Sequence, residues 1–135
     1  MTGSAVRGIL VTHGRLGAEL CRTAEAILGP QADLIALSNT GLSAEALSAE
    51  LRALLPPGER AILFVDLLGG SCGNICSLLK RERPDALLAS GVNLPMLLEF
   101  LVHRGRVDPT ELKERLQSRA VDAIRCIGWE PETRA

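Results

Sequence analysis

Four short, continuously apolar runs constrain the fold of this chain more than any other feature of its sequence. A segment of helical periodicity follows each of these runs, which are GILVT (8–12), DLIAL (33–37), AILFV (61–65) and DALLA (85–89). Strands without polar alternation are typical of a parallel sheet that helices cover on both faces. The alternation therefore predicts an α/β fold, with an open twisted sheet of four parallel strands.

Local signals place the helices and the end of the domain. The helices are predicted over 17–28, 43–55, about 71–83, about 94–102 and 109–119, the last of them introduced by the helix-start signature DPTE (108–111). The stretch VDAIRCI (121–127) alternates only in part and predicts an antiparallel edge strand. Together these elements predict one domain over residues 1–129, followed by a flexible tail over 130–135.

Composition and charge exclude several classes of function. The chain has 135 residues, of which 47% are hydrophobic, and a formal net charge of −1. Nucleic-acid binding needs clustered Lys and Arg, so no nucleic-acid partner is expected. No apolar run approaches the roughly 20 residues that a membrane-spanning helix needs, and a cytoplasmic protein is predicted. In that reducing compartment the four cysteines are expected to be free thiols, and their spacing lacks the paired pattern of a zinc site.

Polar residues follow three of the predicted strands. The first run leads into Thr12-His13-Gly14, the third into Asp66 and LLGGS, and the fourth ends at Ser90-Gly91. Ligands of parallel α/β sheets bind at the carboxyl ends of the strands. If the first and third strands are neighbours, the side chains of His13 and Asp66 can meet at this edge.

Such a cluster favours phosphoryl chemistry. An imidazole nitrogen is nucleophilic, and a carboxylate bonded to the other ring nitrogen fixes its tautomer. The stretch Gly69-Gly70-Ser71 opens a predicted helix whose first N–H groups form an anion site. On its own, a strand-end histidine is more often structural, and Asp66 could simply cap the next helix. No nucleotide-binding fingerprint accompanies them, so the phosphoryl group would arrive on another carrier.

Three stretches resemble the signature sequences of a known family. GILVTHGRLG, VDLLGGSCGN and SGVNLPMLLE are similar to those of the mannose-type IIA domain of the bacterial phosphoenolpyruvate-dependent sugar phosphotransferase system. The resemblance runs from about Arg7 to Gly128. It implies a phosphocarrier that takes a phosphoryl group from phosphohistidine on HPr and passes it to a IIB domain, which serves the membrane components IIC and IID in sugar uptake. It implies no metal and no cofactor.

The resemblance also assigns roles to residues. His13 matches the phosphorylated histidine, Asp66 its hydrogen-bonding carboxylate, and Gly70 with Ser71 the loop that holds the phosphoryl group; Thr12 is a further phosphate-binding candidate. The surface that meets partner proteins is predicted to include Asn93, Leu94, Pro95 and Met96. The family implies a homodimer in which strand 121–127 pairs at a sheet edge and can be exchanged between subunits.

One residue departs from the family pattern, which usually has proline where this chain has Cys72. The anion site needs only N–H groups, so phosphate binding is expected to survive this change. A thiol at a helix start can have a lowered pKa, and on that ground Cys72 is expected to be sensitive to oxidation.

Other functions remain open from the sequence. The same histidine chemistry would serve a regulatory phosphoprotein of an incomplete phosphotransferase system, or the phosphotransfer subunit of a dihydroxyacetone kinase. The stretch GVNLPM favours the mannose-type branch over the latter. A small hydrolase or thiol-redox protein that uses Cys72 and Cys76 is the alternative of a different class.

Overall fold

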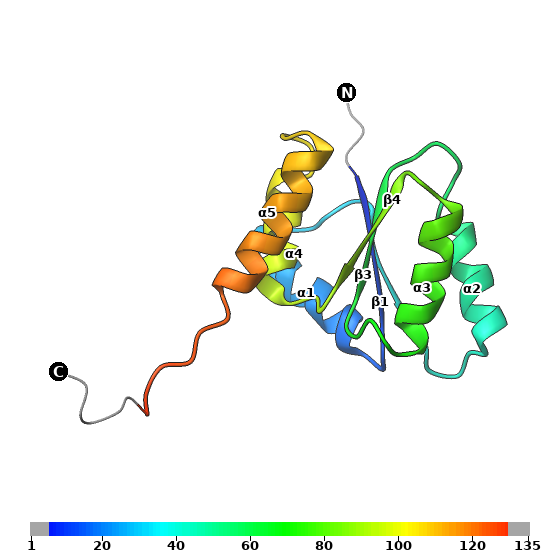
Figure 1. Cartoon of the computed structure of the whole chain (residues 1–135), viewed down its shortest axis with the longest axis horizontal. Helices are drawn as coiled ribbons and strands as arrows, with labels where there is room; N and C mark the ends of the chain where they lie inside the picture. Colours follow the sequence, from blue (N-terminus) through cyan, green and yellow to red (C-terminus); the bar gives the residue numbers. More distant parts are fainter. Residues whose placement is uncertain (1–5, 130–135) are drawn as a thin grey trace.

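The four apolar runs form the strands of one parallel sheet (Figure 1). The computed structural model describes residues 6–129. In it the strands are β1 (Arg7–Thr12), β2 (Leu34–Ser38), β3 (Ala61–Val65) and β4 (Ala86–Ser90). Their order across the sheet is β2-β1-β3-β4, so that β1 and β3 are central. Every residue of β3 is buried, as its lack of polar alternation predicts.

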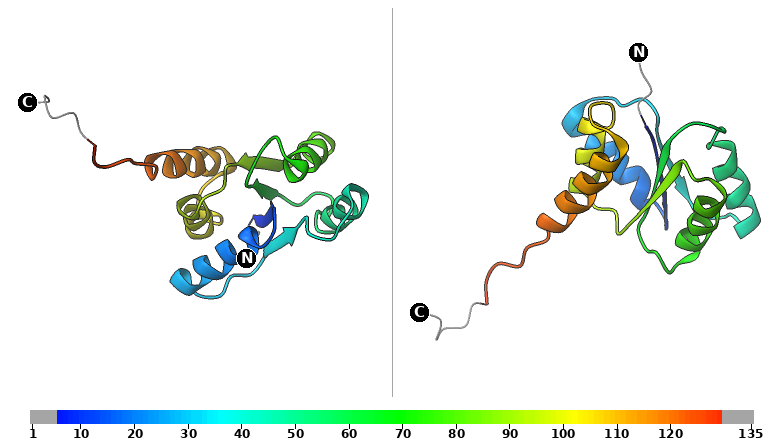
Figure 2. Two further views of the ribbon diagram at one scale, coloured as in Figure 1. Left: turned by 90° about the horizontal axis from the view of Figure 1, so that it is seen from below. Right: turned by 45° about the horizontal axis from the view of Figure 1, so that its top comes forward.

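Five helices cover the two faces of this sheet within the described residues. They are α1 (Leu16–Leu28), α2 (Ala44–Ala53), α3 (Ser71–Glu82), α4 (Leu94–His103) and α5 (Pro109–Asp122). One hydrophobic core joins α1, α4 and α5 to the sheet, and a second core joins α2 and α3 to its other face. Figures 1 and 2 show these two groups of helices on opposite sides of the strands. The predicted α/β fold is confirmed.

Side chains cap the starts of α2, α4 and α5. The backbone amides of Ala46, Met96 and Glu111 donate to the side chains of Ser43, Asn93 and Asp108, respectively. Such caps satisfy N–H groups that have no partner within the helix. By contrast, the residue that precedes α3 is Gly70, which has no side chain to accept such a bond. No capping side chain therefore occupies the first amides of α3.

The predicted edge strand over 121–127 is not formed within the single chain. Residues 121 and 122 instead complete α5, and residues 123–129 belong to no strand or helix. This segment leads away from the sheet in each view (Figures 1 and 2). The edge strand is therefore not confirmed, because a strand requires a hydrogen-bonding neighbour and residues 123–129 have none within the described single chain.

The flexible tail predicted over 130–135 lies outside the described residues. Between residues 6 and 129, no helix combines the length and the apolar character that crossing a lipid bilayer demands.

Helix α4 is the centre of the larger core. Its Phe100 is fully buried and meets Phe64 of β3 edge-on, with ring centroids 5.1 Å apart. A Cβ atom on Gly8 of β1 would lie only 2.6 Å from the Phe100 ring, so glycine at this position allows α4 to approach the sheet. The buried Glu99 of α4 contacts His103 of the same helix and two arginines of α5, Arg115 and Arg119.

This packing predicts the stability of two variants of α4. Phe100→Ala is expected to lower the free energy of unfolding by about 3–5 kcal/mol, because it leaves a cavity between α4 and the sheet. Val102→Ala, on the exposed side of the same helix, should change it by no more than about 0.5 kcal/mol. Chemical denaturation followed by circular dichroism measures both. Equal effects of the two substitutions would contradict the assignment of the core.

Candidate functional site

The two central strands, β1 and β3, end at the point where the order of strands along the sheet reverses. The chain passes from β1 through α1 to β2 on one side, and from β3 through α3 to β4 on the other. Ligands of open α/β sheets bind at such a switch point, beyond the carboxyl ends of the strands. Val11 of β1 lies opposite Val65 of β3 in the register of the sheet. The residues that follow them, including His13 and Asp66, are therefore brought together.

Asp66 holds His13 by both its backbone and its ring. The His13 backbone N–H donates to Oδ2 of Asp66 over 3.1 Å, and ring atom Nδ1 lies 3.0 Å from the same oxygen and 3.3 Å from Oδ1. With Nδ1 occupied, Nε2 is the ring nitrogen left to react. The His13 side chain is 41% exposed, whereas that of Asp66 is 12% exposed. The arrangement thus offers one oriented imidazole nitrogen to a ligand from outside.

The environment of Asp66 keeps its carboxyl group ionised. Burial alone would raise its pKa, but the hydrogen bonds from the backbone and ring of His13 outweigh that effect, and the pKa lies below its ordinary value. A carboxylate with a lowered pKa is charged at neutral pH. It can therefore accept a hydrogen bond from the Nδ1–H group and offset positive charge that develops on the ring.

The uncapped start of α3 lies beside Nε2. A Cβ atom on Gly70 would be 2.9 Å from Cε1 and 3.3 Å from Nε2 of His13, so this glycine is in close contact with the ring edge. Ser71, the next residue, is exposed and is the first residue of α3. Helix starts bind anions through free N–H groups and the positive end of the helix dipole. The sequence-predicted residues Gly70 and Ser71 are thus next to the reactive nitrogen.

Thr12 does not share this position. Its side chain is fully buried, and its Oγ1 accepts the backbone N–H of Gly17 over 2.7 Å. Through this bond Thr12 fixes the first turn of α1, which starts three residues after His13. The structure therefore gives Thr12 a supporting role for the loop rather than a place beside Nε2.

Sequence reasoning missed Asn39, which follows β2. Its side-chain Oδ1 accepts the backbone N–H of Gly14 over 3.2 Å, and its own backbone N–H donates to the Thr12 carbonyl. Gly14 is in the left-handed backbone region, with φ of +57°. Asn39 thus fixes the tight turn directly after His13. The sequence signal for Asn39 was its place in SNTG (38–41), directly after a strand. Polar residues directly after the other three strands had been selected as site candidates for the same reason.

The predicted partner surface, Asn93 to Met96, is largely committed to the fold. Asn93 caps α4, and its Nδ2 donates to the carbonyl of Ala120 in α5. Met96 is buried, and Leu94 and Pro95 are half-buried. Leu94 and Pro95 keep part of their apolar surface exposed, and the partner surface stays a prediction.

The burial of Cys72 contradicts the expectation that its thiol is sensitive to oxidation. Cys72 and Cys76 are both fully buried against the α2–α3 side of the sheet. Burial raises the pKa of Cys72 above its ordinary value and that of Cys76 to about 12. The charge of Asp66 adds to the effect at Cys72. A buried thiol with a raised pKa is inert, so the predicted sensitivity of Cys72 to oxidation was wrong.

No cluster of metal ligands accompanies the site. Within residues 6–129, no three side chains of His, Cys, Asp or Glu lie close enough together to hold a metal ion. The reactive groups found at the edge of the sheet are the imidazole, its carboxylate partner and the free amides at the start of α3.

Comparison with known proteins gives a consistent set of relatives. The family described as "PTS system fructose IIA component" (EIIA-man) matches residues 8–117. The mannose-specific EIIAB component of Escherichia coli K12 is 33% identical over 101 residues, which cover 71% of this chain and 31% of that protein. This chain therefore spans about a third of the length of that relative.

Two further relatives match over nearly their full length. The sorbose-specific EIIA component of Klebsiella pneumoniae is 26% identical, with 95% of this chain and 96% of that protein covered. The crystal structure of the phosphotransferase system component EIIA from Streptococcus agalactiae superposes with a TM-score of 0.84 at 25% identity, covering 90% of this chain and 96% of that one.

The contact between Gly70 and the His13 ring predicts different effects for two neighbouring glycines. Gly70→Ala is expected to push the ring away from Asp66, because the added Cβ would lie 2.9 Å from Cε1. Gly69→Ala is the matched control, since its Cβ would meet nothing within 4 Å. NMR signals of the His13 ring measure the displacement. They should move in Gly70→Ala alone, and unchanged signals in that variant would contradict the geometry.

Proposed function

Because the chain belongs to the EIIA-man family of the phosphotransferase system, we propose that it is a phosphocarrier in sugar uptake. In this proposal His13 accepts a phosphoryl group from phosphohistidine on HPr and donates it to a IIB domain or protein. The observation that supports it most is the pairing of Nδ1 with Asp66, which leaves Nε2 beside the uncapped start of α3. The relatives named for mannose and sorbose support a role in sugar uptake.

The first transfer needs no proton acceptor. The lone pair on Nε2 attacks phosphorus as the N–P bond of the donor breaks, and the electron pair of that bond returns to the donor nitrogen. The ring of His13 keeps its Nδ1 proton and becomes positively charged. Asp66 offsets this charge across a contact of 3.0 Å. Because Asp66 also holds the His13 backbone, the ring is oriented before the donor arrives.

The second transfer uses the same contacts in reverse. A ring that carries both a phosphoryl group on Nε2 and a proton on Nδ1 leaves as neutral imidazole, which is a good leaving group. The backbone amide of the exposed Ser71, at the start of α3, holds the phosphoryl oxygens in both directions. The phosphoryl group therefore enters and leaves without a general acid from another part of the chain.

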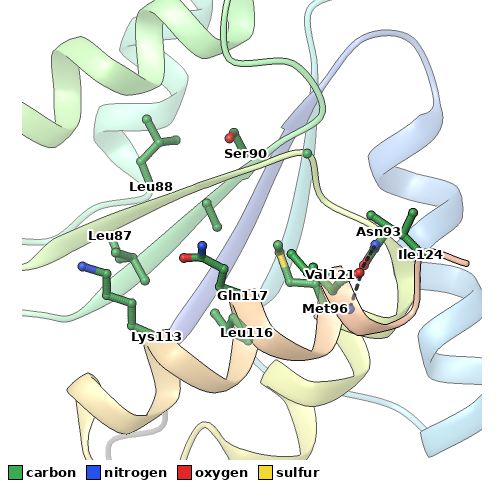
Figure 3. Close-up of a pocket in the computed structure, with 13 residues that line it drawn as sticks. Leu87, Leu88, Ser90, Asn93, Met96, Lys113, Leu116, Gln117, Val121 and Ile124 are labelled. Carbon is green, nitrogen blue, oxygen red and sulfur yellow. Dashed lines mark hydrogen bonds between the residues drawn. The ribbon is translucent and has the colours of Figure 1, made fainter.

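We further propose a homodimer whose interface is formed by the C-terminal segment, residues 123–129. Residues 123–129 include three exposed large apolar side chains, Ile124, Ile127 and Trp129. The groove along the free edge of β4 has a volume of about 430 Å³, and its lining includes Leu87, Gln117 and Val121 (Figure 3). Exposed β4 backbone groups and exposed apolar residues together suit an exchanged strand. In the dimer, residues 123–127 of one subunit pair with β4 of the other.

Phosphorylation in a reconstituted system tests the phosphocarrier proposal. Incubation with phosphoenolpyruvate, enzyme I and HPr should give acid-labile, base-stable phosphate on the wild-type protein. His13→Ala should abolish this label, and Asp66→Asn should slow its formation by a factor on the order of 10². His103→Ala is the matched control, because the chain has two histidines and His103 pairs with Glu99 far along α4. Label that persists in His13→Ala would refute the assignment, and transfer to IIB is measured next.

Truncation tests the exchanged strand. A chain that ends at Asp122 is expected to be a monomer by light scattering, whereas a chain that ends at Trp129 should keep the dimer mass. Far-UV circular dichroism checks that both remain folded. A full-length protein that is monomeric at micromolar concentration, or a dimer that survives removal of residues 123–135, would exclude this arrangement.

A further inference from the structure

A second groove, at the amino ends of β3 and β4, carries positive charge and is called the charged groove below. It has a volume of about 360 Å³, and its lining includes Arg60, Lys80 and Lys113. Within the part of the chain that the structure describes, none of these three cations forms an ion pair. Asp85 also lines the groove, but it is paired with Arg83 over 3.6 Å. The charged groove therefore favours an acidic ligand.

Much of the remaining lining of the charged groove is apolar. It comes from the residue before β1 and from β3, β4 and α5, and it includes Val6, Ile62, Leu87 and Leu112. Ligand sites in proteins commonly combine such an apolar lining with a few charged groups that orient the ligand. A ligand that fits this groove therefore has a large apolar group next to negative charge.

The charged groove is continuous with the groove along the free edge of β4, in which the exchanged strand is proposed to lie. Leu87 and Lys113 line both of them. In Figure 3, these two residues lie at the end of the β4 groove that is far from Ile124. A chain that runs along the edge of β4 toward Leu87 therefore reaches the charged groove.

An exchanged strand would bring its own continuation to this place. Antiparallel pairing of residues 123–127 with the five residues of β4 puts residue 127 opposite the first residue of that strand. The next two residues, Gly128 and Trp129, then lie beside Asp85 and Pro84, which both line the charged groove. The residues that follow the exchanged strand therefore arrive at the charged groove.

These following residues have the chemistry that the charged groove requires. Trp129 is the only tryptophan of the chain, and it is fully exposed in the single chain. Tryptophan has one of the largest apolar surfaces of any side chain, so covering it contributes strongly to binding. Glu130 and Glu132 come next in the sequence and bring two carboxylates. An indole next to two carboxylates matches both the apolar lining and the three cations.

The direction of the chain favours the groove of a second subunit. Pro109 and Thr110, at the start of α5, line the charged groove, whereas residues 123–129 leave from the end of this helix. A helix of 14 residues is about 21 Å long. The segment also leads away from its own sheet in Figures 1 and 2. Exchange between subunits therefore provides the route by which Trp129 reaches a charged groove.

We propose that the charged groove of each subunit binds residues 129–132 of the other subunit. The inference rests on the proposed homodimer and extends it beyond the exchanged strand. Trp129 fills the apolar part of the groove, and the carboxylates of Glu130 and Glu132 pair with its three cations. This complementarity of charge fixes the register in which the exchanged strand pairs with β4.

Tryptophan fluorescence tests this docking, because Trp129 is the one tryptophan of the chain and the chain has no tyrosine. In the wild-type dimer its emission maximum should lie at shorter wavelength than that of free tryptophan in water, since the indole is buried. Dilution to the monomer should move the maximum to the wavelength found in water. Emission that stays at short wavelength in the monomer would place Trp129 against its own chain and overturn the proposal.

Charge reversal tests the cations. In Lys80→Glu/Lys113→Glu, like charges face each other, so the dissociation constant of the dimer should rise about tenfold or more. The tryptophan emission should move to longer wavelength at the same time. Adding Glu130→Lys/Glu132→Lys to this variant restores opposite charges and should restore both values. Analytical ultracentrifugation measures the dissociation constants, and far-UV circular dichroism checks that each variant is folded.

The matched control reverses the charge of two exposed arginines that do not line the charged groove. This variant, Arg81→Glu/Arg106→Glu, should behave as wild type. A chain that ends at Ile127 keeps the exchanged strand, so it should still dimerise, with a raised dissociation constant.

The outcomes separate this proposal from the homodimer on which it rests. A wild-type dissociation constant in Lys80→Glu/Lys113→Glu would overturn the docking, and so would a wild-type dimer whose indole emits as in water. Inorganic phosphate that perturbs the NMR signals of both lysines in the wild-type dimer would assign the groove to a small anion instead. A full-length protein that is monomeric at micromolar concentration would defeat the homodimer as well.

Discussion

The double hydrogen bond from His13 to Asp66 is the interaction on which the rest of the site depends. One carboxylate binds the backbone amide and the ring nitrogen of the same residue, so the position of the loop and the orientation of the imidazole are set together. This contact is possible because β1 and β3 are neighbours in a parallel sheet, with Val11 opposite Val65. The same carboxylate accepts the Leu67 amide and so connects the ring to the loop that exposes Leu67 and Leu68. The Asp66 carboxylate thus contacts the His13 backbone, the His13 ring and the Leu67 backbone at the same time.

The strands and most helices could be predicted from the sequence because burial leaves a clear pattern. Strands covered on both faces are continuously apolar, and each helix start has a cap, a proline or a glycine turn. The last element could not be assigned in this way. VDAIRCI has the composition of a strand, but its first two residues continue α5, and the remainder has no neighbour to pair with inside one chain. Whether such a segment becomes a strand depends on a second subunit, which no local pattern describes.

His13 and Asp66 at the centre of the candidate site could be predicted from the sequence, whereas the roles of the surrounding residues could not. Polar residues at the ends of β1 and β3 identify His13 and Asp66, and glycines before α3 identify the anion site. The direction of the Thr12 hydroxyl, which turns to Gly17, depends on the packing of α1 and is not visible in the sequence. NLPMLL suggested an exposed apolar surface, but α4 is packed against both α1 and α5, which buries Met96 and Leu97. Leu67 and Leu68 are exposed instead because the loop backbone, rather than their side chains, contacts α3.

The balance of charge around His13 would change if this residue is phosphorylated as proposed. Arg15 and Arg22 share the single carboxylate of Glu19, which leaves an excess of positive charge on α1. A phosphoryl group on Nε2 would place about −1.5 to −2 charges beside Asp66. A second phosphorylated donor would then meet like charge at short range, whereas an unphosphorylated acceptor would not. In this proposal the charge on one residue favours an unphosphorylated partner after the transfer.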